Sequence, residues 1–544
     1  MLKKILKIAR YLILILVFLA IIPAVFIAYK IKNDYPLREY IKTNYFTSIP
    51  DDINTYLTPV NKDSVSYLIK RIELIVSDES IDSLKNQIES RLQSINNGND
   101  FILGTSHWTY VPGKLIFKDD TMSVKLRIRG DFPTNYNRDI SESTFRIDIK
   151  GGQFLNGKRK ISLIRPELEN NLFGFLYYKC FESEGLIAND IDFVNLTFNG
   201  KIVGIRFLQE GFSNELTESS GLDEGPILRF KNDCIDNIGR YNPGQFPEMI
   251  AYKEKRILKD KDLSAKYALA LSVYQALADG EIRVEQGFNI DTYAKFMALS
   301  DIFLSHHAYK CQNVKVYFNP KTDKFEPIAW DPSSYVRYNV KLPVFPGHNK
   351  WFGGYHDNPT EYPLHFLLAQ SRSFQSKYVS YLQDYSKIGK IDTMLSQFLP
   401  AISVLKPVLF QQNFQQGFDI NFYKENCQNI RHEFLKDNHI RASAFISEST
   451  LEVRSNQMLP ILIDSIKYLT RTFEYDTILL PGTKIDLPFP VGISLKVKDK
   501  IRIYSTILNT SNSSSYSAKV FYRKSDFRKE HFIEKYKNQL PKLN

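Results

Sequence analysis

Cysteine is scarce in this sequence, with only four residues in 544. The four lie far apart and form no Cys-x-x-Cys pair, so neither a zinc ribbon nor a disulfide-dense scaffold is expected. Familiar catalytic signatures are missing too: there is no GxxxxGK[ST] phosphate loop, GxGxxG, GxSxG or HExxH. The cysteines are Cys180, Cys234, Cys311 and Cys427.

The composition excludes wholesale disorder. Hydrophobic residues make up 43% of the chain and aromatic residues 13%, which is enough to bury a large core. At about 150 residues per domain, the length indicates three to four units, or one large domain with a small appendage.

Excess positive charge is absent from the middle of the chain, although the formal net charge is +11. Residues 1–32 hold six basic and no acidic residues, and residues 519–544 hold eight basic and three acidic ones. The stretch between them has 57 of each sign. The net charge therefore gives no support for a nucleic-acid partner.

Only one apolar run is long enough to cross a membrane. Residues 11–29 carry no charge, and four basic residues with no acidic one precede them. The positive-inside rule predicts a single-pass anchor in the lipid bilayer, with the rest of the chain extracytoplasmic, in the periplasm or at the cell surface. A cleaved signal peptide is the alternative.

The remaining pattern predicts an α+β protein with a sheet-rich first part, a helical second part and a small C-terminal β module. Alternating apolar residues predict strands at 123–130 and 145–150, and Asn199-Gly200 predicts a hairpin. Helical spacing occurs at 80–95, 172–186, 262–279, 291–310 and through most of 363–450. The expected segments are an anchor (1–32), a stalk (33–64), a main body (65–450), a β module (451–518) and a basic polar tail (519–544).

The most informative stretch is 305–334, where two oxygen-bearing side chains flank a predicted hairpin. Asn313 opens the first strand and Asp331 follows the second, so antiparallel pairing would bring them together. A carboxylate with an amide oxygen suits Mg²⁺ bound to phosphates, and protein kinases place an Asn and an Asp around a hairpin in this way. An ordinary hairpin with a buried Asn and a turn-capping Asp is the alternative.

The position where a kinase carries a catalytic Asp holds histidines instead. His306 and His307 precede Asn313, and His307 is the candidate for the group that orients the acceptor hydroxyl, because a neutral imidazole can take up a proton. The two histidines could equally be satisfied core or surface residues. A zinc site is disfavoured, because Cys311 is a weak third ligand.

Three arginines are candidates for contacts with phosphate. Arg127 and Arg129 share one face of a predicted strand, and Arg146 lies on the next strand. Guanidinium groups fit phosphate oxygens, but each arginine could also make a surface charge or a structural ion pair.

Taken in order, these segments resemble the CotH (spore-coat protein H) kinase family, which has an atypical protein-kinase-like fold. The resemblance covers about 65–385. It rests on RIRG (127–130), FRIDIK with FLNGKRKISL, the hairpin NLTFNGKIVGIRFLQEGF, the segment from Asn313 to Trp330-Asp331, and PLHFLLAQSRSFQSKYVSYL.

The resemblance implies phosphorylation of Ser or another hydroxyl, on a protein or a glycan, with Mg and ATP as cofactors. It also implies that Asn313 and Asp331 bind the metal and that Arg127, Arg129, Arg146 and Glu210 bind the nucleotide. The sequence departs from the family pattern at His307, where an Asp is usual, and at Arg146, where a Lys is usual.

Two functions follow from the sequence. One is a membrane-anchored CotH-like phosphotransferase, and the other is a catalytically degenerate member that serves binding or assembly in the cell envelope. Metal-dependent hydrolysis through the His pair and Asp331 is a third idea, but it lacks a full ligand set.

Overall fold

The computed structural model describes residues 68–96, 108–130, 133–231, 246–332, 362–412, 418–445, 450–481, 483–488 and 499–521. The predicted anchor and stalk lie outside these ranges, as does most of the predicted tail. Within the ranges, no helix combines the length and the apolar character that a bilayer crossing needs.

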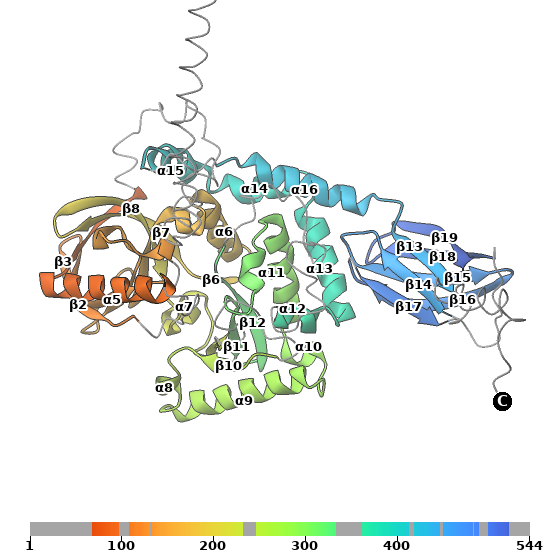
Figure 1. The fold of residues 1–544 in the computed structure, drawn as a ribbon, viewed down its shortest axis with the longest axis horizontal. Coiled ribbons are helices and arrows are strands. Elements are labelled where there is room, and N and C mark those ends of the chain that lie inside the picture. Colours follow the sequence, from red (N-terminus) through yellow and green to blue (C-terminus); the bar gives the residue numbers. More distant parts are fainter. Residues whose placement is uncertain are drawn as a thin grey trace, which may run out of the picture.

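The α+β class predicted from the sequence is confirmed, and three sheets are distributed along the molecule (Figure 1). The first is a closed barrel in the order β1-β2-β3-β4-β5-β8-β7. Its strands are β1 (Lys70–Ile75), β2 (Val111–Phe117), β3 (Asp120–Ile128), β4 (Phe145–Ile149), β5 (Lys160–Ile164), β7 (Ile191–Phe198) and β8 (Lys201–Glu210).

Apolar side chains at alternate positions along the strands fill the barrel. Leu126 and Ile128 of β3 and Ile147 of β4 are fully buried in the barrel core, so the residues between them face outward. The predicted hairpin is present as β7–β8, and its two turn residues, Asn199 and Gly200, have φ of 47° and 79°. Two consecutive positive φ values are what a tight two-residue hairpin turn requires. Helix α5 (Asp78–Asn96) packs Leu84 and Ile88 against the same core.

The second sheet has the order β10-β9-β11-β12-β6 and forms the centre of the molecule. Its strands are β6 (Ile187–Ala188), β9 (Ile227–Phe230), β10 (Met249–Ala251), β11 (Lys315–Asn319) and β12 (Lys324–Ala329). The hairpin expected between Asn313 and Asp331 is therefore present as β11–β12, which pair antiparallel.

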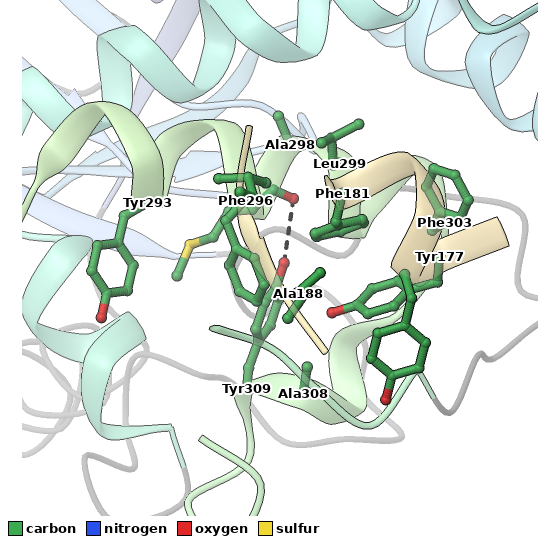
Figure 2. Packing of buried hydrophobic residues seen from close by; sticks show 14 of the residues in the cluster. Tyr177, Phe181, Ala188, Tyr293, Phe296, Ala298, Leu299, Phe303, Ala308 and Tyr309 are labelled. Carbon is green, nitrogen blue, oxygen red and sulfur yellow. Dashed lines mark hydrogen bonds between the residues drawn. The ribbon is translucent and has the colours of Figure 1, made fainter. Parts of the chain in front are cut away.

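The remaining helices pack against the second sheet, the barrel or one another. They are α6 (Leu172–Ser183), α7 (Asn214–Ser219), α8 (Glu254–Ile257), α9 (Lys261–Ala278), α10 (Val284–Gly287), α11 (Ile290–Ile302), α12 (Pro363–Leu368), α13 (Arg372–Tyr385), α14 (Lys390–Ser396), α15 (Leu399–Gln412) and α16 (Asn421–Phe434). Figure 2 shows Phe181 of α6 beside Phe296 of α11 and beside Phe303, the residue that follows α11, with ring centroids 5.6 and 5.9 Å apart. This aromatic packing fixes α6, which precedes β6, against the central helix.

Two cysteines of the described residues are free thiols. Cys180 and Cys427 are both buried, and burial raises the pKa of each thiol. Cys311, by contrast, is disulfide-bonded. It lies two residues before Asn313, so the cross-link is next to the start of the β11–β12 hairpin.

The third sheet has the order β16-β15-β18-β19-β13-β14-β17. Its strands are β13 (Ile440–Phe445), β14 (Thr450–Ser455), β15 (Ile461–Tyr468), β16 (Arg471–Leu479), β17 (Lys484–Pro488), β18 (Lys500–Ile507) and β19 (Ser513–Phe521). The strands begin before the expected boundary at 451, because β13 pairs along its whole length with β14.

This β module contacts the helical part directly. Asn512 donates from Nδ2 to the carbonyl of Phe434, at the end of α16, over 2.7 Å. Leu459 and Ile507, which belong to the module by sequence, are fully buried in the main core. The module is therefore packed onto the body rather than tethered to it.

Candidate functional site

The ends of the β11–β12 hairpin bring three predicted site residues together. Asp331 Oδ2 lies 3.0 Å from Nδ1 of His307, and Asn313 Nδ2 lies 2.9 Å from the same nitrogen. Asn313 also donates to the His307 carbonyl at 3.0 Å. His307 reaches this point from the short 3-10 helix His306–Tyr309, which precedes β11.

Asp331 is held in an unusual backbone conformation, with φ of +52°. Such a conformation is uncommon for residues other than glycine and is often found at functional sites. Burial by itself would raise the pKa of Asp331, but the interactions with His307, Arg129 and Lys315, that with His307 the largest, outweigh burial and lower it. Asp331 is thus an ionised carboxylate at neutral pH.

The oxygen atoms at this point fit a hard divalent cation. A carboxylate and an amide oxygen are ligands that Mg²⁺ accepts, and Mg²⁺ commonly takes its other ligands from water and from substrate phosphates. Among the described residues, no group of three His, Cys, Asp or Glu side chains is placed to hold a metal ion. The side chains at this point thus offer at most two oxygen ligands of this kind, one from Asp331 and one from Oδ1 of Asn313.

Arg129 lies beside Asp331 and makes a buried ion pair. Its Nη2 is 3.1 Å from Glu169 Oε1 and 3.3 Å from Gln209 Oε1, and its guanidinium lies over the ring of Trp330 at 5.3 Å. Glu169 is 5% exposed, and its second oxygen, Oε2, has no hydrogen-bond partner. Burial raises the pKa of Glu169 to about 7, although Arg129 opposes the rise.

A strained turn carries Glu169 into the site. Glu169 ends a 3-10 helix, and the two asparagines that follow it both have positive φ, 59° and 51°. Asn170 donates to the carbonyl of Pro332 at 3.1 Å, which ties the turn to the residue after Asp331. The sequence reasoning missed Glu169, because only tertiary contacts join this turn to the ends of β3 and β12.

Positive charge gathers around the site. Arg127 and Arg146 are opposite each other on β3 and β4, and burial together with Arg129 and Arg127 lowers the pKa of Arg146 to about 10. Lys315 is opposite Arg229 on β11 and β9, and burial and Arg229 lower its pKa to about 7. Cations that depress one another's pKa indicate a site built for an anion.

Aromatic rings form one wall beside these cations. Phe212 lies 4.7 Å from both Trp330 and Tyr252, measured between ring centroids. Arg229 lies over Tyr252 at 5.7 Å, just as Arg129 lies over Trp330. Both arginines are therefore stacked on aromatic rings, and Arg129 is also held by its ion pair with Glu169.

Glu210 is not among the residues that meet at Asp331. Its Oε2 accepts from the backbone N–H of Asp190 at 3.4 Å, and its surroundings include Lys158 and Glu215. Burial, opposed by Lys158, raises its pKa to about 7. The residue of β8 that reaches Arg129 is the neighbouring Gln209.

An Asn and an Asp at the two ends of a hairpin, with a buried Arg–Glu pair beside them, form the arrangement of a kinase-like protein. Residues 126–388 match the family model described as CotH kinase protein. The chain therefore contains a CotH-family domain over these residues, as the sequence resemblance predicted. No curated protein matches the chain.

Proposed function

We propose that this protein is a membrane-anchored, extracytoplasmic phosphotransferase that uses Mg-ATP to phosphorylate a hydroxyl group on a protein or other acceptor. The observation that supports it most is the meeting of Asp331, Asn313 and His307 beside the Arg129–Glu169 pair, in a chain that contains a CotH-family domain. The anchor rests on the apolar run at 11–29 and its basic flank.

The proposal gives each group a task. Asp331 and Asn313 would hold Mg²⁺, which when bound neutralises charge on the phosphates. Arg127, Arg129 and Arg146 would bind phosphate oxygens, and Glu169 would fix the guanidinium of Arg129.

His307 would orient the acceptor. With its Nδ1 hydrogen directed at Asp331, the neutral imidazole has its lone pair on Nε2, which can take the proton of the attacking hydroxyl. A carboxylate hydrogen-bonded to one ring nitrogen makes the other a better base.

A second function is favoured by one observation, the contact of a single His307 nitrogen with both proposed metal ligands. That nitrogen holds one proton at most, so the contacts compete. If they persist when nucleotide is bound, the protein would bind a nucleotide in the envelope without transferring its phosphate.

Asp331→Asn tests the first proposal. We expect Mg-dependent ATP turnover by the full chain in detergent to fall to background, because Asn removes the ionised ligand. Asp119→Asn, at an exposed turn, is the matched control and should keep turnover. Turnover that survives Asp331→Asn at an unchanged melting temperature would contradict the site assignment.

A thermal shift separates the two functions. Mg-ATP at about 100 times its dissociation constant stabilises a folded protein by about 2.7 kcal/mol. A shift without turnover in the wild-type chain would favour the binding function. If the wild-type chain shows no shift and no turnover, both functions are excluded.

A further inference from the structure

The outward side of strands β3, β4 and β5 carries more positive charge than a nucleotide site requires. Two rows of side chains cross it, as the strand register shows. One row joins Arg127 to Arg146, next to the site. The next row joins Lys125, Asp148 and Lys160. Lys150 follows Asp148 at the end of β4, where its N–H donates to the carbonyl of Ser123.

We call this surface the basic face and define it by Lys125, Arg127, Arg146, Lys150 and Lys160. Within strands β3 to β5 it includes one carboxylate, Asp148, whose ion pair with Lys125 is long at 3.9 Å. Burial and the charge of Lys125 lower the pKa of Lys150, and burial is also the main cause of the lowered pKa of Lys160. Asp148 opposes the fall at both lysines, and it is the largest charge effect on Lys160.

The far part of the basic face lies beyond the reach of the phosphates at Asp331. Lys125 is four residues from Arg129 along β3, which is about 13 Å at the usual strand rise. Its side chain is 40% exposed, and Lys150 is exposed as well. These lysines are thus accessible to a second anionic group.

Tyr110 fixes two cations of the face. Its ring lies 4.5 Å from Lys125 Nζ and 5.5 Å from the guanidinium of Arg127, and its hydroxyl donates to Asp148 at 3.3 Å. Cations held over a ring lose less conformational freedom when they bind an anion.

We propose that the basic face is the docking surface for an acidic stretch of the polypeptide that accepts the phosphoryl group. This inference rests on the proposed phosphotransferase function and names its substrate class. An extended peptide places every second side chain on one side, about 6.7 Å apart. Lys125 lies about two such steps from Arg129, so a carboxylate of the acceptor would meet Lys125, with Lys150 beside it, while a hydroxyl about two steps further along the peptide reaches Asp331.

The test measures docking without catalysis. A fluorescein-labelled peptide of alternating Glu and Ser is titrated against the full chain in detergent, with no nucleotide, and anisotropy is recorded at two salt concentrations. We expect saturable binding that weakens as salt rises, and no binding of a Lys-Ser peptide. Equal binding of the two peptides would overturn the proposal.

Charge reversal locates the surface. The double variant Lys125→Glu with Lys150→Glu should weaken binding of the Glu-Ser peptide about tenfold or more, since two favourable contacts become repulsive. The matched control, Lys467→Glu with Lys500→Glu, reverses two exposed lysines of the β module and should leave binding unchanged. Equal weakening by both pairs would overturn the assignment to the basic face.

Two further arms identify the occupant and separate this inference from the proposed function. Polygalacturonate, a carboxylate polymer without peptide bonds, should compete weakly, and tighter binding than the peptide would overturn the choice of a polypeptide. Docking of the peptide to the wild-type chain is compared with Mg-dependent ATP turnover by the same preparation. Loss of docking with turnover intact would contradict only this inference, whereas docking without turnover would contradict only the proposed function.

Discussion

Adjacent residues of β8 lie in different surroundings. Gln209 is fully buried and contacts Arg129 and the hydroxyl of Tyr178, whereas Glu210 lies near Lys158 and accepts from the Asp190 backbone. Because side chains alternate along a strand, a shift of one position decides whether a residue belongs to the site.

Glu210 should make stability depend on pH. Its pKa rises from an ordinary 4.5 to about 7 in the folded protein, so the native state holds a proton that the unfolded chain releases. The contribution of Glu210 to stability is then greatest below pH 4.5 and declines as pH rises towards 7. Glu210→Gln cannot ionise, and it should gain up to about 3 kcal/mol over the wild type by pH 8.

Unfolding midpoints at pH 5 and pH 8 measure this effect. Asp190→Asn gives a contrast, because Lys179 and Lys158 outweigh burial and lower the pKa of Asp190 to about 2. That variant should be less stable than the wild type at both pH values. A Glu210→Gln difference that is the same at pH 5 and pH 8 would contradict the assignment.

The sequence predicted only part of the site. Asn313 and Asp331 could be paired because they flank one hairpin, whose register follows from local alternation. The Arg129–Glu169 pair could not, since it joins the end of β3 to a turn forty residues later with no periodic signal. The contact of His307 with Asp331 likewise depends on a positive φ that the sequence does not mark.

At the scale of the element, the start of α6 is packed so closely that it leaves no room for a larger residue. A Cβ added at Gly174 would lie 1.9 Å from the Glu169 carbonyl oxygen, so the turn that carries Glu169 would have to move. Gly174 therefore allows the close approach that places Glu169 near Arg129.

Gly174→Ala should both destabilise the protein and impair the site. Overpacking of this kind costs about 1–3 kcal/mol, and a displaced Glu169 would release Arg129, so ATP turnover should fall more than stability alone explains. Turnover well below the melting temperature is the measurement. Ser183→Ala, at an exposed position of the same helix, is the control, and an equally active Gly174→Ala would show that the turn is not coupled to the site.

Helices and hairpins were predicted more accurately than the pairing between strands that are far apart in the sequence. The strong helical period gave 262–279, and α9 is Lys261–Ala278. The stretch 363–450 was expected to be mostly helical, but β13 begins at Ile440. Its residues form a strand because they pair with β14 and β19. Closure of the barrel through parallel β1 and β7 left no local signal at all.

At the scale of the molecule, the β module and the body share core residues. Leu459 and Ile507 are fully buried in the main core, whereas Ile463 is buried in the module's own core. The three tryptophans of the chain, Trp108, Trp330 and Trp351, all precede the module. Tryptophan fluorescence therefore reports on the body alone.

Leu459→Ala should lower the midpoint of the unfolding transition seen by tryptophan fluorescence, although Leu459 belongs to the module by sequence. Truncating a buried Leu costs about 2–5 kcal/mol, and this cost falls on the shared core. Ile463→Ala removes a similar volume from the module's own core and should shift the tryptophan transition less. Equal shifts would mean that body and module unfold as one unit, and no shift for Leu459→Ala would contradict the shared core.

The closed barrel also sets the order of events when the chain is made. β1 pairs with β7 in the register Ile72 with Leu196, so the first strand must wait until the β7–β8 hairpin has left the ribosome. Until then the edge of β1 that pairs with β7 has no strand beside it, and the barrel core lacks the side chains of β7 and β8. Such late, non-local closure is slow and leaves strand edges exposed, so a ribosomal pause before residue 191 would lengthen the period in which the nascent protein is prone to aggregate.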